Sequence, residues 1–220
     1  MSDPRALYRA GLEAFRRGET ERSRELNEQS VALARERDDG PAIVNALMGL
    51  ARVALREGDL ERVHGLAREG RELATARGLG EESLRLPLHL DAEATRMGGD
   101  FRTARSLYEQ SIALNRRLGN ARMVAVEQSN LAWVEINEGK LDEAEALIRE
   151  SLESPGEDDG YLRAFCLVAL ARCAAERGDK ALAQERLAEA DRLLDEAGLI
   201  LDPADRREYE RTVALARAAP

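Results

Sequence analysis

The stretch that decides the fold is NLAWVEINEGKLDEA, residues 130–144. Two runs of strong helix formers meet there at Gly139 and the polar Lys140, which is typical of a helix, a tight turn and a second helix. Outward from this turn, a glycine followed by a polar residue recurs about every 40 residues, at Gly18, Gly58, Gly99 and Gly178. A fixed period of this size is the sequence mark of a stacked repeat protein. The sequence therefore predicts five helix–turn–helix units.

Small residues occupy three fixed positions in each unit, counted from its glycine. Seven before it stand Gly11, Ala51, Ala92, Ala132 and Ala171; five after it Ser23, Val63, Ala104, Ala144 and Ala183; twelve after it Ser30, Gly70, Ser111, Ser151 and Ala190. Val63 is the exception in size. Helix axes that cross closely require small side chains at the contact, so these positions predict where neighbouring helices meet.

In this pattern the chain resembles the tetratricopeptide repeat family over about residues 4–197. The turn motif recurs as Gly99-Asp100-Phe101-Arg102-Thr103-Ala104 and Gly58-Asp59-Leu60-Glu61-Arg62-Val63. The resemblance implies an all-α, right-handed α-solenoid forming one superhelical domain over residues 1–220. Its five repeats would span about 4–40, 41–80, 81–120, 121–160 and 161–198, followed by a capping helix at 203–218.

Three departures distinguish this chain from the usual repeat. The period exceeds the family's usual length of about 34 residues, Leu mostly replaces the aromatic of the first helix, and the proline that usually ends the second helix is missing. In its longer period the chain is similar to the repeats of bacterial maltose-activator-type regulators. The nucleotide-binding GxxxxGK[ST] loop that often accompanies those repeats does not occur in this sequence.

The resemblance also implies a binding surface, because stacked repeats bind partners on their concave face and the first helices line that face in this family. We matched the family's lining positions to this sequence by counting back from the glycine of each repeat. The expected lining residues are then Tyr8, Leu12, Met48, Arg52, His89, Glu93, Arg96, Ser129, Trp133, Asn137 and Arg172, with Phe15 and Arg56 nearer the turns.

Three of these residues suggest the chemistry of the partner. Arg52 and Arg172 can bind a carboxylate through paired hydrogen bonds, or can form ion pairs with groove acids such as Glu93 and Glu176. Trp133, the only tryptophan, can stack an apolar or cationic group, or can belong to the core. The sequence thus predicts a protein or peptide partner with acidic groups or a C-terminal carboxylate.

Composition excludes several classes of function. The net charge of −9 opposes nucleic-acid binding, which needs a basic footprint. No apolar run approaches the roughly 20 residues of a membrane span, and the first residues lack the pattern of a signal peptide, so we expect a cytoplasmic protein without membrane contact. Nearly all of the 33 Lys and Arg residues are Arg. This indicates a bacterium with a GC-rich genome, the alternative being that Arg serves here for its chemistry.

Catalytic chemistry is also not indicated. His64 and His89 fall in different repeats, and no HExxH motif or nucleophile turn is present. Cys166 and Cys173 lie about two helical turns apart, too far to form a disulfide, and are predicted to be buried thiols. We predict no enzyme, no catalytic residue, no metal and no cofactor.

The leading functional hypothesis is an adaptor or scaffold that binds a protein or peptide in its concave groove. One alternative is a regulatory subunit that senses a peptide or a small effector. Another is a self-assembling structural protein, forming a homodimer through a terminal helix that exposes Tyr209 and Val213. The acidic loop at 154–160 is a second candidate for partner contact, with a plain solvated loop as its alternative.

Overall fold

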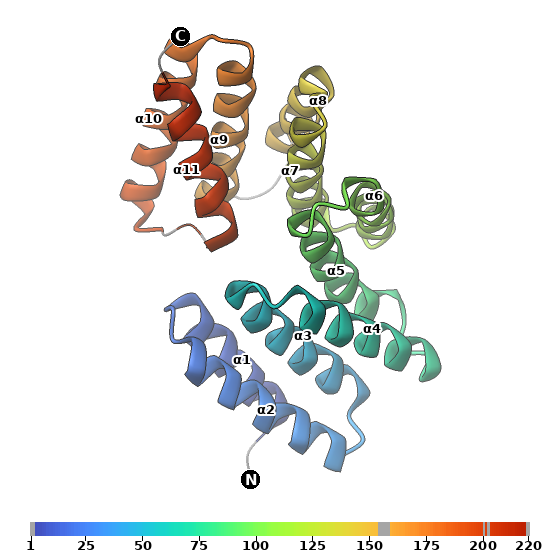
Figure 1. The fold of residues 1–220 in the computed structure, drawn as a ribbon. Coiled ribbons are helices and arrows are strands. Elements are labelled where there is room, and N and C mark those ends of the chain that lie inside the picture. The colour runs from blue at the N-terminus through green and yellow to red at the C-terminus, as the bar shows by residue number, and fades with distance from the viewer. Residues whose placement is uncertain (1–2, 154–158, 200, 202, 219–220) are drawn as a thin grey trace. The chain divides into compact units, whose positions relative to one another are not determined.

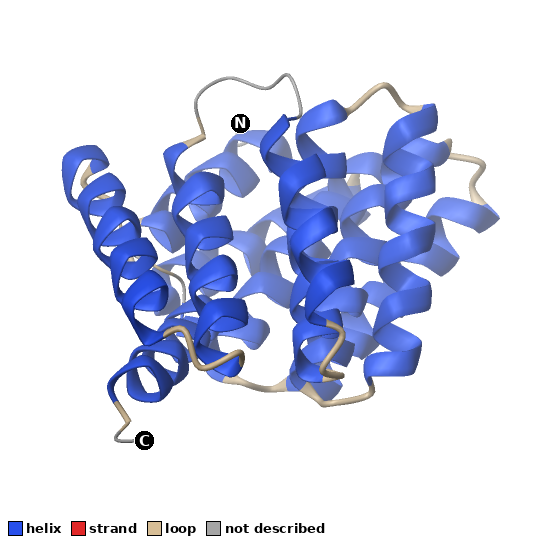
Figure 2. Cartoon of the chain, turned by 90° about the horizontal axis from the view of Figure 1, so that it is seen from above, coloured by secondary structure: helices blue, strands red, loops and turns tan. Residues whose placement is uncertain are grey.

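The computed structural model describes residues 3–153, 159–199, 201 and 203–218. Within them, the regular structure is helical throughout, and short loops join the helices (Figure 1, Figure 2). This confirms the predicted all-α class. Most of the loop at 154–160 lies outside the described residues.

The chain divides into two compact units, Met1–Thr103 and Ala104–Pro220, and each is described by itself. Unit 1 contains α1 (Pro4–Arg16), α2 (Thr20–Glu36), α3 (Gly40–Glu57), α4 (Leu60–Ala76), the short 3-10 helix η1 (Glu81–Leu84) and α5 (Arg85–Met97). The division falls in α6 (Phe101–Arg117), and unit 2 continues with α7 (Ala121–Asn137), α8 (Leu141–Glu153), α9 (Gly160–Glu176), α10 (Lys180–Ala197) and α11 (Pro203–Arg217). A single domain over 1–220 stays a prediction.

The turn inside each repeat follows from two adjacent residues. Gly58 takes the left-handed conformation with φ of 78°, which glycine adopts without a side-chain penalty. The next residue, Asp59, accepts a hydrogen bond from the backbone N–H of Arg62 at 3.1 Å and so caps α4. Asp100 and Asp179 cap their helices in the same way. Glu19 makes no such cap and instead forms an ion pair with Arg17.

The turn between α2 and α3 uses a different residue. Asp38 has φ of 54° and, among the described residues, is the only non-glycine with positive φ. Its carboxylate Oδ1 lies 2.6 Å from Nη1 of Arg77. An L side chain in the left-handed region costs about 1–2 kcal/mol, so Asp38 carries backbone strain that glycine would relieve.

Comparing Asp38→Ala with Asp38→Gly isolates this strain, because both changes remove the same ion pair. We expect the Gly variant to be more stable than the Ala variant by about 1 kcal/mol, measured by denaturant unfolding. Equal stability of the two variants would show that the turn is not left-handed at this residue.

The small positions predicted between helices are buried. Ala51, Ala92, Ala132 and Ala171 have no exposed surface, and neither has Val63. At the third small position, Ser30 and Ser151 also hydrogen-bond to the preceding helix. Ser30 Oγ donates to the carbonyl of Pro4 at 2.7 Å, and Ser151 Oγ donates to that of Ala125 at 2.8 Å. The small serine side chains, with their short hydroxyl groups, allow the two helices of a repeat to lie close together.

Asn27 of α2 is buried between two glycines of neighbouring helices. Its side chain is 1% exposed and donates to the carbonyl of Ser23 at 2.8 Å. Glycines face it from both neighbouring helices: a Cβ on Gly11 of α1 would lie 2.7 Å from Asn27 Nδ2, and a Cβ on Gly49 of α3 would lie 2.0 Å from Asn27 Oδ1. The amide fits only because both facing residues lack a side chain.

The last helix, α11, packs against α9 and α10 of unit 2. Tyr209 and Val213, the residues predicted for self-association, lie against the core of unit 2. Tyr209 Oη donates a 2.7 Å hydrogen bond to Asp191, and burial raises the pKa of this phenol to about 12. Both side chains therefore pack within unit 2.

Candidate functional site

In unit 1, the predicted lining residues of the first two repeats form a partly exposed surface between α1 and α3. Tyr8, Leu12 and Phe15 follow one another at helical spacing along α1, and Arg52 and Arg56 lie one turn apart on α3. All five side chains are half-buried. We call these five residues the α1–α3 surface.

Arg56 is held in place on this surface. Its guanidinium carbon lies 3.5 Å from the centroid of the Phe15 ring, and Nη1 donates to the Phe15 carbonyl at 2.6 Å. The stacking is a cation–π contact, which is favourable when the cation is partly desolvated. Arg56 and Phe15 therefore form a fixed platform beside Arg52.

Arg52 has much weaker anchoring. The hydrogen bond from its Nη1 to the hydroxyl of Tyr8 is long, at 3.5 Å, and within the described part of the chain Arg52 forms no ion pair. A guanidinium presents five N–H donors in a plane that matches a carboxylate. Arg52 is thus a half-buried cation whose natural partner, an acid, is not supplied by the surrounding described residues.

The other predicted residues of unit 1 are less available. His89 and Glu93 lie one turn apart on α5 and face each other, with His89 Nε2 3.6 Å from Glu93 Oε2. Met48 is fully buried and Arg96 is 4% exposed. The prediction that Met48 and Arg96 line a groove is therefore wrong, because neighbouring helices cover them.

In unit 2, Trp133 and Ser129 are also not lining residues. Trp133 is fully buried on α7, and its ring centroid lies 5.3 Å from that of Phe165 on α9. Ser129, one turn earlier, is 1% exposed. The groove assignment is wrong for both, and the core alternative holds for Trp133. The physical reason is that α7 packs against both α8 and α9, so a run of its residues is covered on every side.

Two predicted residues of unit 2 remain accessible but are already engaged. Asn137 is exposed, and its Nδ2 donates to the carbonyl of Trp133 at 2.7 Å. Arg172 is half-buried, and its Nε lies 2.8 Å from Glu176 Oε1 one turn later. The ion-pair alternative named for Arg172 is thus confirmed.

The two cysteines are inert buried thiols, as predicted. Neither Cys166 nor Cys173 has exposed surface, and neither forms a disulfide. Burial raises the pKa of Cys173 to about 12 and also raises that of Cys166. Because the thiolate is the reactive form of cysteine, neither side chain is suited to nucleophilic chemistry.

One charged cluster of unit 1 was not predicted from the sequence. Asp91 of α5 is 8% exposed; His64 Nδ1 lies 2.6 Å from its Oδ1, and Arg71 is paired with its other oxygen. His64 and Arg71 lie seven residues apart on α4, which is the only sequence signal for this arrangement. The cluster joins α4 to α5, and the charge of Asp91 is compensated by its own neighbours on α4.

Two kinds of feature are absent from the described residues. No three His, Cys, Asp or Glu side chains gather there as ligands for a metal ion. None of the described helices combines the length and hydropathy needed to cross a bilayer.

No family model matches this sequence, and no curated protein does. Solved structures do match. The apo form of RapI shares 11% identity over 98% of this chain and 77% of its own, with a TM-score of 0.72. BtubC (BKLC) from P. vanneervenii shares 17% over 88% of this chain and 80% of its own, with a TM-score of 0.67.

A third similar structure is TTC0263, a thermophilic TPR protein of Thermus thermophilus. It shares 21% identity over 96% of this chain and 99% of its own, with a TM-score of 0.62. At such identities the likeness concerns the fold, and the finer similarity to maltose-activator-type repeats stays a prediction. The chain has the tetratricopeptide-like fold, an all-α solenoid of helix–turn–helix repeats.

Proposed function

We propose that this chain is a non-enzymatic adaptor or scaffold that binds a protein or peptide through the α1–α3 surface. The observation that carries the proposal is Arg52, a half-buried guanidinium that lacks an acidic partner among the described residues. Burial of a cation is costly unless an anion compensates it. An acidic side chain or a C-terminal carboxylate of a partner would supply that anion.

The neighbouring side chains support a peptide as the partner. The Tyr8 hydroxyl beside Arg52 offers a further hydrogen bond to a bound carboxylate. Leu12 and the Phe15–Arg56 platform offer apolar and aromatic contact area next to the charge. Tyr and Arg are among the side chains most enriched at energetic hot spots of protein interfaces.

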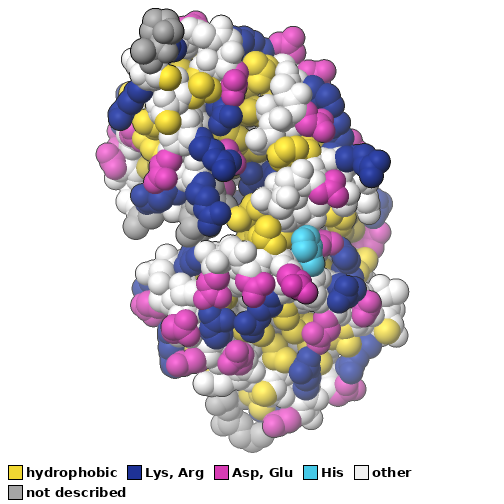
Figure 3. Space-filling view, viewed as in Figure 1, with side chains coloured by type: hydrophobic (Ala, Val, Ile, Leu, Met, Phe, Trp, Pro, Cys, Tyr) yellow, Lys and Arg dark blue, Asp and Glu magenta, His cyan; other side chains and the backbone are white. Residues whose placement is uncertain are grey.

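The charge distribution also favours a protein partner over a nucleic acid. Net charge is −9, and on the face shown in Figure 3 cationic and anionic side chains are interspersed. Nucleic-acid binding rests on clustered cations that replace phosphate counterions. The bacterial cytoplasm stays the predicted location.

The proposal is tested with the full chain and a library of peptides that have free C-termini. We expect enrichment of peptides with terminal or side-chain carboxylates. For an enriched peptide, Arg52→Gln should weaken binding about 10- to 100-fold, since a hydrogen-bonded charge contributes about 1.5–3 kcal/mol. Affinity is measured by fluorescence anisotropy, with circular dichroism to verify the fold of each variant.

Arg172→Gln is the matched control, because Arg172 is the same residue type at the same register but is already paired with Glu176. It should leave the peptide affinity nearly unchanged. Unaltered binding by Arg52→Gln, or equal losses in the two variants, would contradict a site at the α1–α3 surface.

A further inference from the structure

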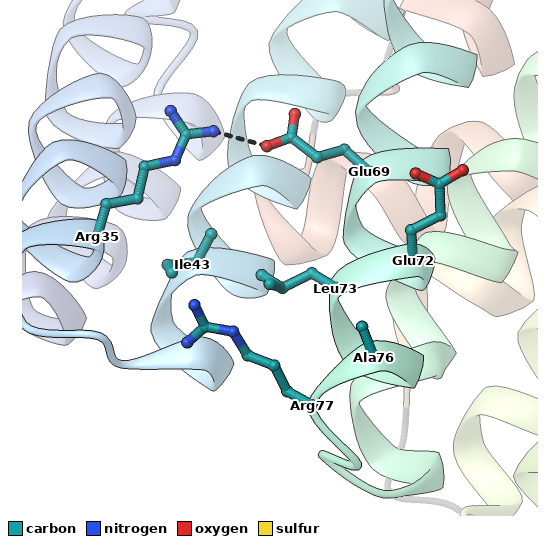
Figure 4. A pocket seen from close by; sticks show the side chains of 7 residues that line it. All are labelled: Arg35, Ile43, Glu69, Glu72, Leu73, Ala76 and Arg77. Carbon is teal, nitrogen blue, oxygen red and sulfur yellow. Dashed lines mark hydrogen bonds and ion pairs between the residues drawn. The ribbon is translucent and has the colours of Figure 1, made fainter.

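A pocket of about 540 Å³ lies in unit 1 between α2, α3 and α4 (Figure 4). This volume falls in the range of small-molecule sites, about 300–1,000 Å³. None of the pocket residues belongs to the α1–α3 surface. The lining side chains are Arg35, Ile43, Glu69, Glu72, Leu73, Ala76 and Arg77.

The floor of the pocket is apolar. Ile43, in the first turns of α3, is 4% exposed, and Leu73 of α4 is half-buried beside it. The exposed Ala76, three residues after Leu73 on α4, extends the apolar area to the rim. Such a floor suits an aliphatic group, since removal of apolar surface from water is the main favourable term in its binding.

The positive charges stand on either side of Ile43. Figure 4 shows the guanidinium groups of Arg35 and Arg77 flanking this residue. Arg35 Nη2 lies 2.6 Å from Glu69 Oε1, and Arg77 is held by Asp38 at 2.6 Å. These pairs use only some of the five N–H donors of each guanidinium, so both arginines are positioned with donors to spare.

The negative charges come from α4, where Glu69 and Glu72 lie one turn apart. Glu69 is occupied by Arg35. Glu72 makes no hydrogen bond or ion pair with any residue that the structure describes. The lining therefore contains two cations and two anions, with the carboxylate of Glu72 as the unpaired anion.

We propose that this pocket binds a small zwitterion with an aliphatic side chain, namely a free aliphatic amino acid or its dipeptide. The carboxylate of the ligand would bind the spare donors of Arg35 and Arg77, its ammonium group would bind Glu72, and its side chain would cover Ile43 and Leu73. A ligand with only a negative charge leaves Glu72 unmatched, and one with only a positive charge faces two arginines. This site is independent of peptide binding at Arg52 and would serve the regulatory alternative.

The experiment titrates the full chain with L-leucine, leucyl-leucine, N-acetylleucine and leucinamide by isothermal titration calorimetry. We expect both zwitterions to bind, and each singly charged analogue to bind about tenfold more weakly, because it loses a charge-assisted hydrogen bond. Glu72→Gln should weaken leucine binding about tenfold and leave N-acetylleucine binding unchanged. Glu109→Gln, an exposed position on α6, is the control and should bind leucine like the original chain.

Three results would each overturn the proposal: no saturable binding of either zwitterion at millimolar concentration, equal binding of all four compounds, or unchanged leucine binding by Glu72→Gln. Arg52→Gln should bind leucine normally. Failure of this pocket is therefore distinguishable from failure of the α1–α3 surface, which is measured with a peptide probe.

Discussion

Trp133→Ala is expected to lower the free energy of unfolding by about 3–5 kcal/mol, the usual cost of removing a buried tryptophan side chain. The indole is fully buried in the core of unit 2 and packs against Phe165. Its removal leaves a large cavity between α7 and α9. Denaturant unfolding followed by far-ultraviolet circular dichroism measures the loss.

Trp133→Phe is the matched comparison. It keeps an aromatic ring against Phe165 and removes the indole N–H, which is buried and has no hydrogen-bond acceptor among the described residues. We expect it to cost clearly less than Trp133→Ala, because most of the core volume remains and an unsatisfied donor is eliminated. If Trp133→Ala kept its stability but lost peptide binding, Trp133 would have to be a lining residue of the groove and not part of the core.

Gly49→Ala is expected to destabilise the chain by about 2–3 kcal/mol, although helix propensity alone predicts a gain of about 1 kcal/mol. The added Cβ would lie 2.0 Å from Oδ1 and 2.4 Å from Cγ of Asn27. Asn27 cannot move away freely, since it is bonded to Ser23 and confined by Gly11 on its other side. Thermal and denaturant unfolding measure the change.

Gly65→Ala provides the control with the opposite sign. Gly65 also lies inside a helix, α4, but apart from its own helical turn no atom lies within 4 Å of the position of an added Cβ. We expect it to stabilise the chain by about 0.5–1 kcal/mol. The double variant Gly49→Ala with Asn27→Ala should recover part of the loss, because the overlapping atoms are gone. Stabilisation by Gly49→Ala alone would disprove the contact.

Most of the fold was predictable from the sequence because its determinants are local. A glycine that ends one helix and an aspartate that caps the next act within a few residues, as at Gly58 and Asp59. The recurrence of that turn and of small residues such as Ala132 then specifies how the helices stack. The burial of the Asn27 amide was not predicted, because the space for it depends on glycines from two other helices.

The candidate site was predictable only in part. The position of a residue within its repeat predicts the face of the helix on which it lies, but not how many neighbouring helices cover that face. Trp133 and Arg52 share a register, yet α7 is enclosed and the corresponding part of α3 is open enough for Arg52 to be half-buried. The sequence did indicate which of the two arginines, Arg52 or Arg172, forms an ion pair within its own helix. Four residues after Arg172 stands Glu176, whereas four residues after Arg52 stands Arg56.

The position of Asn27 also has a consequence for how such a chain can be shortened or recombined. The residue belongs to the first repeat, but the space for its amide is completed by Gly49 of the second. An exchange that cut between these repeats and joined a unit with a bulkier residue at that place would have no room for the amide. We therefore expect the first two repeats to tolerate exchange or duplication only when they are moved together.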